Sequence, residues 1–325
     1  MNILSDTTSK RNEPGAFAPS APPSAAPTGR SNSVSPHERL QLLHLKPIES
    51  TDPNTEQLSI RIHGDASLAT LVYLPGIHGD WTLASSFRER MKPRFRVVEF
   101  TYPRTMAWTL GEYASAVLSA LERNQIWEGA IIGESFSSQV AWALLDICER
   151  GNYIAPTPGR ERSFRPTALI LAGGFVRYPA MPLIDLALWL WPYVPGGAIR
   201  LFLNAYALAA RWRHRHAPET KAAVREFIER RTPEDLAAMR HRLKLIRDYD
   251  PTEIARRIKL PVFQLAGLFD PIVYFPAVRR DLERHCPGYM ESKLIRPGDH
   301  NVLGTAPNRA AVQVTEWMAQ VTGQP

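Results

Sequence analysis

The chain has 325 residues, of which 44% are hydrophobic and 22% charged, with two cysteines and a formal net charge of +7. This apolar fraction is enough for a large core and excludes a wholly disordered or collagen-like chain. Two cysteines are too few for a disulfide framework or a cysteine-based metal cluster, and they fit a reducing compartment, so we expect a cytoplasmic protein. The whole excess of positive charge falls in residues 175–260, which is not the pattern of a diffusely basic nucleic-acid-binding protein.

The first 50 residues are predicted to form a disordered tail. Residues 1–36 contain six prolines and seven serines but few large apolar side chains. Such a segment cannot bury enough surface to offset the entropy of ordering it. The first ten residues lack the apolar run of a secretory signal, and the acidic Asp6 and Glu13 are unusual for an organelle transit peptide, which stays the minor alternative.

From about residue 56 onward, segments with strand and helix character alternate. The predicted strands are 57–62, 68–74, 94–100, 129–132, 167–172, 261–267 and 292–297, and the predicted helices are 81–92, 109–125, 136–149, 276–285 and 307–321. The first two strands flank Gly64 and Asp65 and are predicted to form a hairpin. Short apolar strands that alternate with helices predict an α/β fold, with a mostly parallel, doubly wound sheet covered on both faces.

Residues 175–258 interrupt this alternation with helical sequence and are predicted to be an inserted helical cap. The catalytic core would then comprise residues 51–174 and 259–325. The first half of the cap, 181–210, contains only two charged residues, and prolines and glycines break it into pieces too short to span a membrane. We therefore expect two apolar helices above a site, with Trp189 and Trp191 in contact with the substrate.

The second half of this cap, 211–258, is rich in arginine and supplies the positive charge. A face of this kind is most often a solvated surface, and His214, His216 and His241 are interpreted as part of it. The alternatives are contact with an anionic substrate or carrier, or peripheral contact with an acidic membrane. Residues 214 and 216 would point to different faces of a helix, so no metal site is expected.

The strongest local signal is the segment IGESFS at 132–137, which follows an apolar strand and opens a helix. A serine on so tight a strand-to-helix turn projects its hydroxyl above the sheet, and its neighbours must be small because the two backbones approach closely. Ser135 is therefore the candidate nucleophile of a G-x-S-x-G-like motif, with Ser137 in place of the last glycine. The alternative is that Ser135 only caps the helix.

Two residues in the C-terminal third are suited to activate that serine. Asp270 follows the strand 261–267, and His300 follows the strand 292–297, so the chain order is Ser, Asp, His. A serine nucleophile needs a base, and the base needs an acid to hold its tautomer. Of the nine histidines, only His300 stands at such a position. Asp299 is the alternative acid, which is disfavoured because neighbouring side chains diverge.

A fourth element is the loop LPGIHGDW at 74–81. The second oxyanion donor belongs in a loop at this place, beside the amide of the residue after the nucleophile. The backbone amides of Ile77 and Phe136 are therefore the predicted pair, and Gly76 and Gly79 would let the loop approach the substrate oxygen. The alternative is a plain glycine-rich turn. The sequence contains no phosphate-cradling glycine motif.

Over residues 56–322 the chain resembles the α/β-hydrolase superfamily, with the cap inserted after the family's sixth strand as in the lidded serine esterases. The LPGIHGDW loop and the GESFS turn resemble those of bacterial α/β-fold hydrolases and of a related group of acyltransferases. The resemblance implies a Ser135–His300–Asp270 triad, an acyl-enzyme intermediate and no cofactor, but no particular substrate. The family's His-Gly pair in the loop is Pro75-Gly76 in this chain.

The sequence therefore predicts a serine hydrolase that cleaves a small carboxylic ester or thioester with an apolar acyl group, free or carrier-bound. An acyltransferase with the same triad is the closest alternative, because only the acceptor of the acyl group differs. A non-catalytic binding protein of the same fold is a third hypothesis. Such a protein would usually have lost a triad residue, whereas all three positions hold suitable side chains.

Overall fold

The computed structural model describes residues 57–153, 163–193, 201, 205, 208 and 232–323, all of which lie in the unit Pro47–Pro325. The predicted tail, 1–50, lies outside the described residues. So do His214, His216 and most of the second apolar helix predicted for the cap.

The described strands form one seven-stranded sheet in the order β1-β3-β2-β4-β5-β6-β7, and all neighbours except β1 and β3 are parallel. The strands are β1 (Ser59–His63), β2 (Thr70–Leu74), β3 (Arg96–Thr101), β4 (Glu128–Glu134), β5 (Arg165–Ala172), β6 (Val262–Gly267) and β7 (Tyr289–Ile295). The mostly parallel, doubly wound sheet predicted from the sequence is therefore confirmed.

The hairpin predicted for the first two strands is wrong. β1 pairs with β3 in antiparallel register, Ile60 opposite Phe100, while β2 lies between β3 and β4. β2 is buried from Leu71 to Leu74, so it needs a partner on both edges and helices on both faces. β1 is partly exposed along its length, which suits the edge of the sheet.

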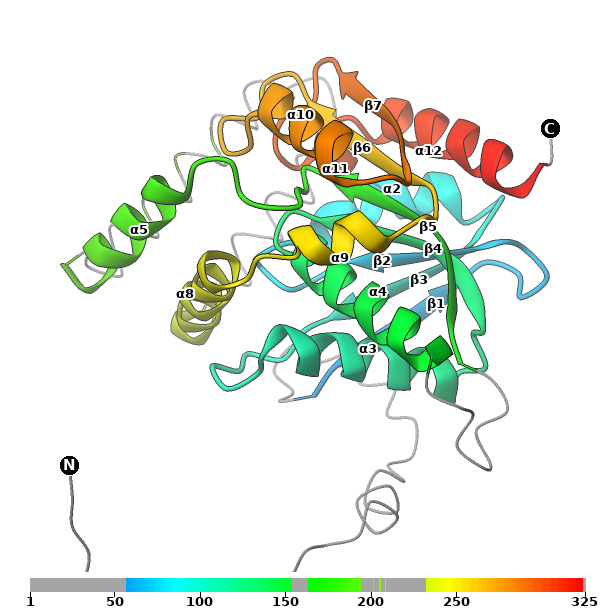
Figure 1. The fold of residues 1–325 in the computed structure, drawn as a ribbon, viewed down its shortest axis with the longest axis horizontal. Helices are drawn as coiled ribbons and strands as arrows, with labels where there is room; N and C mark the ends of the chain where they lie inside the picture. The colour runs from blue at the N-terminus through cyan, green and yellow to red at the C-terminus, as the bar shows by residue number, and fades with distance from the viewer. Residues whose placement is uncertain are drawn as a thin grey trace, which may run out of the picture. The chain divides into compact units, whose positions relative to one another are not determined.

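Helices cover both faces of the sheet (Figure 1). Successive residues of a strand point to opposite faces, so Val72 and Leu74 pack in one core layer and Leu71 and Tyr73 in the other. The first layer contains α3 (Leu110–Arg123), α4 (Ser137–Tyr153), α9 (Thr252–Arg257) and α10 (Phe275–His285), and the second contains η1 (Thr82–Ala84), α2 (Ser85–Met91), α11 (Val302–Thr305) and α12 (Pro307–Thr322).

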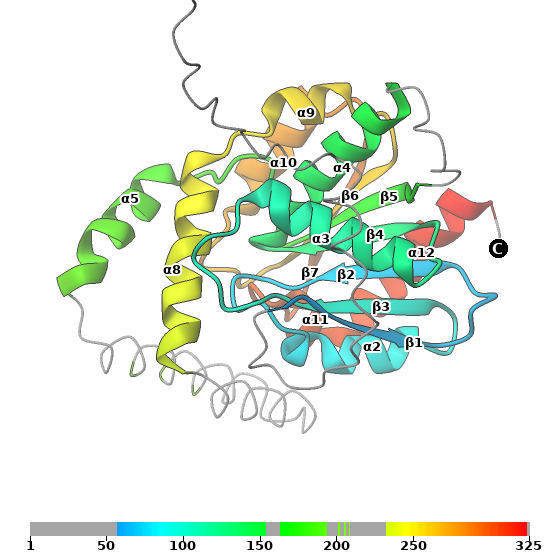
Figure 2. The same cartoon turned by 90° about the horizontal axis from the view of Figure 1, so that it is seen from below.

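The chain between β5 and β6 contributes α5 (Met181–Leu190), η2 (Trp191–Tyr193), α8 (Pro233–Asp248) and α9. α8 lies between α5 and the sheet (Figure 2), and α9 packs against α4 and α10. Thr232 caps α8 by accepting from the amide of Asp235, whose carboxylate accepts in turn from the amide of Thr232. Among the described helices, none combines the length and the apolar character that crossing a membrane requires.

Candidate active site

Ser135 occupies a tight turn between β4 and α4 in which its backbone is strained. Its φ is +49°, a left-handed conformation that is costly for any residue with a side chain. Its amide donates to the carbonyl oxygen of Ala172 at 3.0 Å, so the neighbouring strand β5 stabilises the turn. Strained backbone of this kind clusters at functional sites, where the surrounding structure enforces it.

Gly133 is required by the same turn, and we expect Gly133→Ala to lower the free energy of unfolding by about 1–3 kcal/mol. A Cβ atom at this position would lie 2.9 Å from the carbonyl oxygen of Ser137. Gly151, further along α4, is the matched control because a Cβ there would meet nothing within 4 Å. Gly151→Ala should be neutral or stabilising by up to ~1 kcal/mol. Urea unfolding of both variants measures this, and equal stabilities would refute the steric account.

The structure brings Ser135, His300 and Asp270 together at the carboxyl edge of the sheet. His300 Nε2 lies 2.8 Å from Ser135 Oγ, and His300 Nδ1 lies 2.9 Å from Asp270 Oδ2. The other carboxylate oxygen of Asp270 accepts from the amides of Ile272 and Val273 at 2.8 and 2.9 Å. Asp270 is therefore fixed by its own loop while it binds the ring of His300.

The charges around the ring set its proton affinity. Burial alone would lower the pKa of His300, but the hydrogen bond and the charge of Asp270 outweigh burial and raise that pKa above its ordinary value of 6.5. The carboxylates of Glu134 and Asp299 act in the same direction. The charges at the site therefore stabilise the protonated form of the ring, the imidazolium.

Asp299, the alternative acid, has other partners. Its Oδ1 accepts from the amide of Asn301 and the hydroxyl of Thr305, both at 3.0 Å. These bonds place the carboxylate at the start of the short helix α11. The acid whose oxygen lies at hydrogen-bond distance from His300 Nδ1 is Asp270.

A buried carboxyl group lies directly beside the serine. Burial raises the pKa of Glu134, although hydrogen bonds from the Tyr73 hydroxyl and the Gly76 backbone partly oppose this effect. Burial and the adjacent Glu134 hold the pKa of Tyr73 well above its ordinary value. This pair connects β2, the loop after it and the turn that carries Ser135.

The loop after β2 is held against that turn by a second set of polar contacts. The hydroxyl of Ser137 donates to the carbonyl oxygen of Pro75, so the hydroxyl of Tyr102, 2.7 Å away, must donate to Ser137. The serine that replaces the usual glycine of the motif is completely buried, and its hydroxyl both donates and accepts a hydrogen bond. The departure from G-x-S-x-G therefore adds a link between the turn and the loop.

Trp189 and Trp191, predicted to contact the substrate, lie at the end of α5 and in η2. Trp189 is 64% exposed and packs against Tyr193, with ring centroids 5.9 Å apart. Within the described residues, the structure gives neither tryptophan a contact with the Ser135–His300 pair. Their role stays a prediction.

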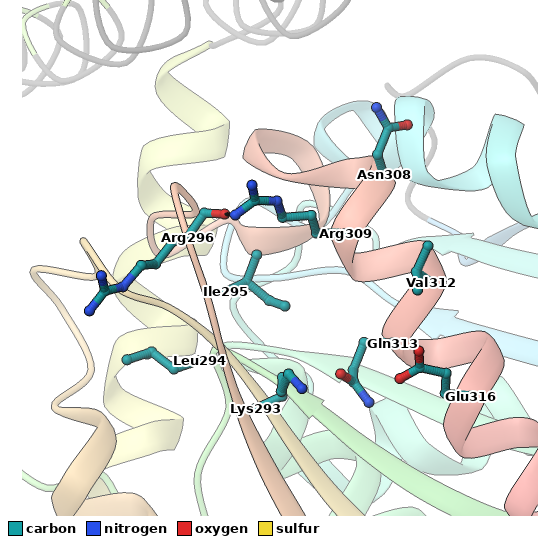
Figure 3. Close-up of a pocket in the computed structure, with 9 residues that line it drawn as sticks. All are labelled: Lys293, Leu294, Ile295, Arg296, Asn308, Arg309, Val312, Gln313 and Glu316. Carbon is teal, nitrogen blue, oxygen red and sulfur yellow. Dashed lines mark hydrogen bonds between the residues drawn. The ribbon is translucent and has the colours of Figure 1, made fainter.

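A cavity of about 510 Å³ lies away from this cluster, between β7 and α12 (Figure 3). Arg296 and Arg309 line it, with Val312 from the exposed side of α12. None of the residues that line it belongs to the Ser135 cluster. Across the described ranges, no three His, Cys, Asp or Glu side chains gather so that they could hold a metal ion.

In the segment predicted to be the cap, whose arginine-rich part was interpreted as a solvated face, Arg242 is buried and His241 is only partly exposed. Arg242 is 1% exposed, and His241 is half-buried with its Nε2 2.8 Å from the carbonyl oxygen of Trp108. Both lie on α8, whose opposite face does carry exposed charges such as Lys244 and Arg247. Arginine-rich composition therefore did not reveal which cations point inward, because that depends on what the helix packs against.

Comparisons with known proteins agree with this topology. The sequence matches no protein-family model and no curated protein. The structure is similar to a thermophilic esterase from Thermogutta terrifontis (TM-score 0.62, 20% identity, 81% of this chain and 93% of the other). It is also similar to a carboxylesterase structure from Nitrososphaera gargenis (TM-score 0.61, 17% identity, 82% of this chain and 95% of the other). A third similar structure is the enol-lactonase from Burkholderia xenovorans (TM-score 0.59, 14% identity, 82% of this chain and 96% of the other).

The chain has the α/β-hydrolase fold. In this α/β-hydrolase fold, Ser135 follows β4, Asp270 follows β6 and His300 follows β7, so three segments distant in sequence meet at one edge of the sheet. Sequence reasoning did not identify Tyr73 or Arg242. Nothing in the sequence marked Tyr73 as part of the site, because a tyrosine within an apolar strand is indistinguishable from an ordinary core residue.

Proposed function

We propose that this protein is a serine hydrolase that cleaves a carboxylic ester or thioester. Ser135 is the nucleophile, His300 the general base and Asp270 the acid that orients the imidazole. The observation that carries the proposal is the continuous hydrogen-bonded chain Ser135 Oγ–His300–Asp270, which starts at a residue held at φ +49°. A hydroxyl bonded to an oriented base is the arrangement that nucleophilic catalysis requires.

The reaction proceeds through a covalent acyl-enzyme. His300 takes the proton of Ser135 as Oγ attacks the carbonyl carbon, and the imidazolium then donates that proton to the departing alcohol or thiol. Water, deprotonated by His300, attacks the acyl group and releases the acid and free Ser135. Asp270 keeps the proton of the neutral imidazole on Nδ1, so that Nε2 faces Ser135 with its lone pair.

The amides of Ile77 and Phe136 stabilise the oxyanion that forms in both steps. Among the described residues, no carbonyl accepts from either amide. Phe136 follows the nucleophile directly, and Ile77 stands in the loop that Ser137 and Glu134 hold against the turn. Two backbone donors without a carbonyl partner, one directly after the nucleophile and one in the adjoining loop, are suited to a charge that exists only in the transition state.

The substrate is proposed to be a small ester or thioester with an apolar acyl group. α5 contains a single charged residue, Asp185, and would present apolar surface to such a group, with Trp189 and Trp191 at its end. The similar structures include esterases and an enol-lactonase, which is in keeping with the proposed cleavage of a carboxylic ester. A series of p-nitrophenyl esters of increasing chain length would define the preferred acyl group.

A fluorophosphonate probe tests the proposed chemistry directly. Ser135 should attack the phosphorus and displace fluoride, which leaves one covalent adduct that mass spectrometry of the intact protein detects. Peptide mapping should place the adduct on Ser135 rather than on Ser137 or Ser138. No adduct, or an adduct on another serine, would refute the proposal. Added alcohol acceptors then distinguish acyl transfer from hydrolysis, because a transferase would divert most of the acyl group to the alcohol.

The pH dependence of kcat/KM follows from the raised pKa of His300. Only the neutral imidazole can accept the Ser135 proton, so activity is expected to fall as the pH decreases through that pKa. Because Asp270, Glu134 and Asp299 raise the pKa, the midpoint of the acid limb should lie above 6.5. Initial rates across the pH range in which circular dichroism shows a folded protein measure this. A midpoint below 6.5 would contradict it.

A further inference from the structure

Arg242 is a buried cation whose partners are unusual. It lies on α8 and is 1% exposed, yet no described carboxylate forms an ion pair with it. Its Nη1 donates to the carbonyl oxygen of Ile77 at 2.8 Å, and its Nη2 donates to that of Pro103 at 2.9 Å. The rings of Tyr102 and Tyr113 lie 5.6 and 5.9 Å from the guanidinium carbon. Carbonyl dipoles, aromatic rings and the Tyr113 hydroxyl, which accepts from Nε at 3.4 Å, therefore replace the usual counter-ion.

The loop after β2 is shaped around this guanidinium. Gly79 has a φ of +82°, and a Cβ atom on it would lie 2.4 Å from Arg242 Nη1. The carbonyl oxygen of Gly79 accepts from the amide of Tyr102 at 2.7 Å. Only glycine allows this backbone to approach the cation so closely.

The contact of Arg242 restrains the peptide groups on which the proposed oxyanion site depends. The amide of Gly79 donates to the carbonyl oxygen of Gly76 at 2.9 Å, which fixes the peptide plane between Gly76 and Ile77. In a trans peptide the C=O and N–H bonds point in opposite directions, so the Ile77 amide faces away from that turn. Arg242 donates to the carbonyl oxygen of Ile77 and so holds the peptide plane between Ile77 and His78. Because the planes on both sides of Ile77 are held, both of its backbone dihedral angles are restrained.

α8 is held by contacts that do not involve Arg242, so the backbone that carries the Arg242 side chain has a fixed position. Arg104, in the loop after β3, forms a two-point ion pair with Asp235 at 2.8 and 3.2 Å. One turn and a half further along α8, His241 contacts the carbonyl oxygen of Trp108. We therefore expect the helix to stay in place when the residue at 242 is changed.

The geometry points to Arg242 as a positioning residue that holds the Ile77 amide in the orientation needed to stabilise the oxyanion, and so couples helix α8 to the reaction. This inference rests on the proposed hydrolase function. Arg242 touches neither substrate nor reacting atoms, and it acts through the backbone of Ile77. This positioning role requires the two N–H groups of a guanidinium, because a single side chain spans the carbonyl oxygens of Ile77 and Pro103.

The test compares Arg242→Met with Lys244→Met, an exposed position on the same helix. Losing one oxyanion donor altogether lowers kcat by about 10²–10³-fold, and misplacing it should lower kcat by roughly 10- to 100-fold with KM unchanged. The second readout is inhibition by an alkyl trifluoromethyl ketone. Ser135 Oγ bonds to the ketone carbon, His300 takes the proton and the ketone oxygen becomes the oxyanion. Its affinity should fall by the same factor, whereas that of the corresponding alcohol should not change.

Arg242→Lys keeps the charge and provides a variant that does not depend on the folding of Arg242→Met. Its ammonium group cannot span both carbonyls, so an intermediate loss of ketone affinity is expected. Ketone affinity equal to wild type in Arg242→Lys, or a change in KM alone in Arg242→Met, would overturn the inference. If wild-type protein fails to react with the fluorophosphonate, the proposed function falls; if wild type reacts and Arg242→Met behaves as Lys244→Met, only the role of Arg242 falls.

Discussion

Ser135→Ala is expected to lower kcat by about 10⁴–10⁶-fold while leaving the fold intact. The methyl group removes the nucleophile, and with it the hydrogen bond of 2.8 Å to His300. The residual rate should still exceed the uncatalysed reaction by roughly 10³-fold, because the oxyanion site and substrate binding remain. Steady-state kinetics on a p-nitrophenyl ester measure the loss, and circular dichroism verifies the fold.

Ser115→Ala is the control for this change. Ser115 lies on the exposed side of α3, so the same substitution there should leave kcat and KM at the wild-type values. A Ser135→Ala variant that retains more than about a tenth of the activity would show that another group attacks the carbonyl.

Asp270→Asn is expected to lower kcat by about 10⁴-fold. An amide at this position can still contact His300, but it stabilises neither the imidazolium nor the tautomer with its proton on Nδ1. The substitution also removes the main cause of the raised pKa of His300. The pH–rate profile of the variant should therefore show an acid limb displaced to lower pH, which a purely structural defect would not produce.

Asp299→Asn distinguishes the role of Asp299 from that of Asp270, the two carboxylates near His300. Asp299 accepts from Asn301 and Thr305 at the start of α11, so we expect a lower melting temperature and a kcat within about tenfold of wild type. If kcat falls more in Asp299→Asn than in Asp270→Asn, Asp299 is the acid of the triad and the assignment must be reversed.

The parts of the site that could be predicted from sequence are those that follow from local backbone chemistry. Ser135 stands in a short segment whose small neighbours allow only a tight turn, and Asp270 and His300 follow strands that share one edge of a parallel sheet. Each of these inferences needs only the place of a residue relative to its own strand.

The parts that could not be predicted depend on contacts between distant segments. Arg242 stands among other cations in the sequence, and its burial becomes evident only when α8 is placed against Ile77 and Pro103. The order of the first strands could not be predicted for the same reason, because β3 follows β1 and β2 in the sequence but lies between them in the sheet. α11, with four residues, is too short to leave a periodic pattern.

The position of the triad along the chain has a consequence for the newly synthesised protein. Ser135 and His300 are separated by 165 residues, and a ribosome adds roughly 5–20 residues per second. His300 is thus added to the chain about 8–33 seconds after Ser135. During that interval Ser135 lacks the base proposed for it, so under the proposed function the nascent chain is expected to be unable to hydrolyse esters until the segment after β7 has been translated.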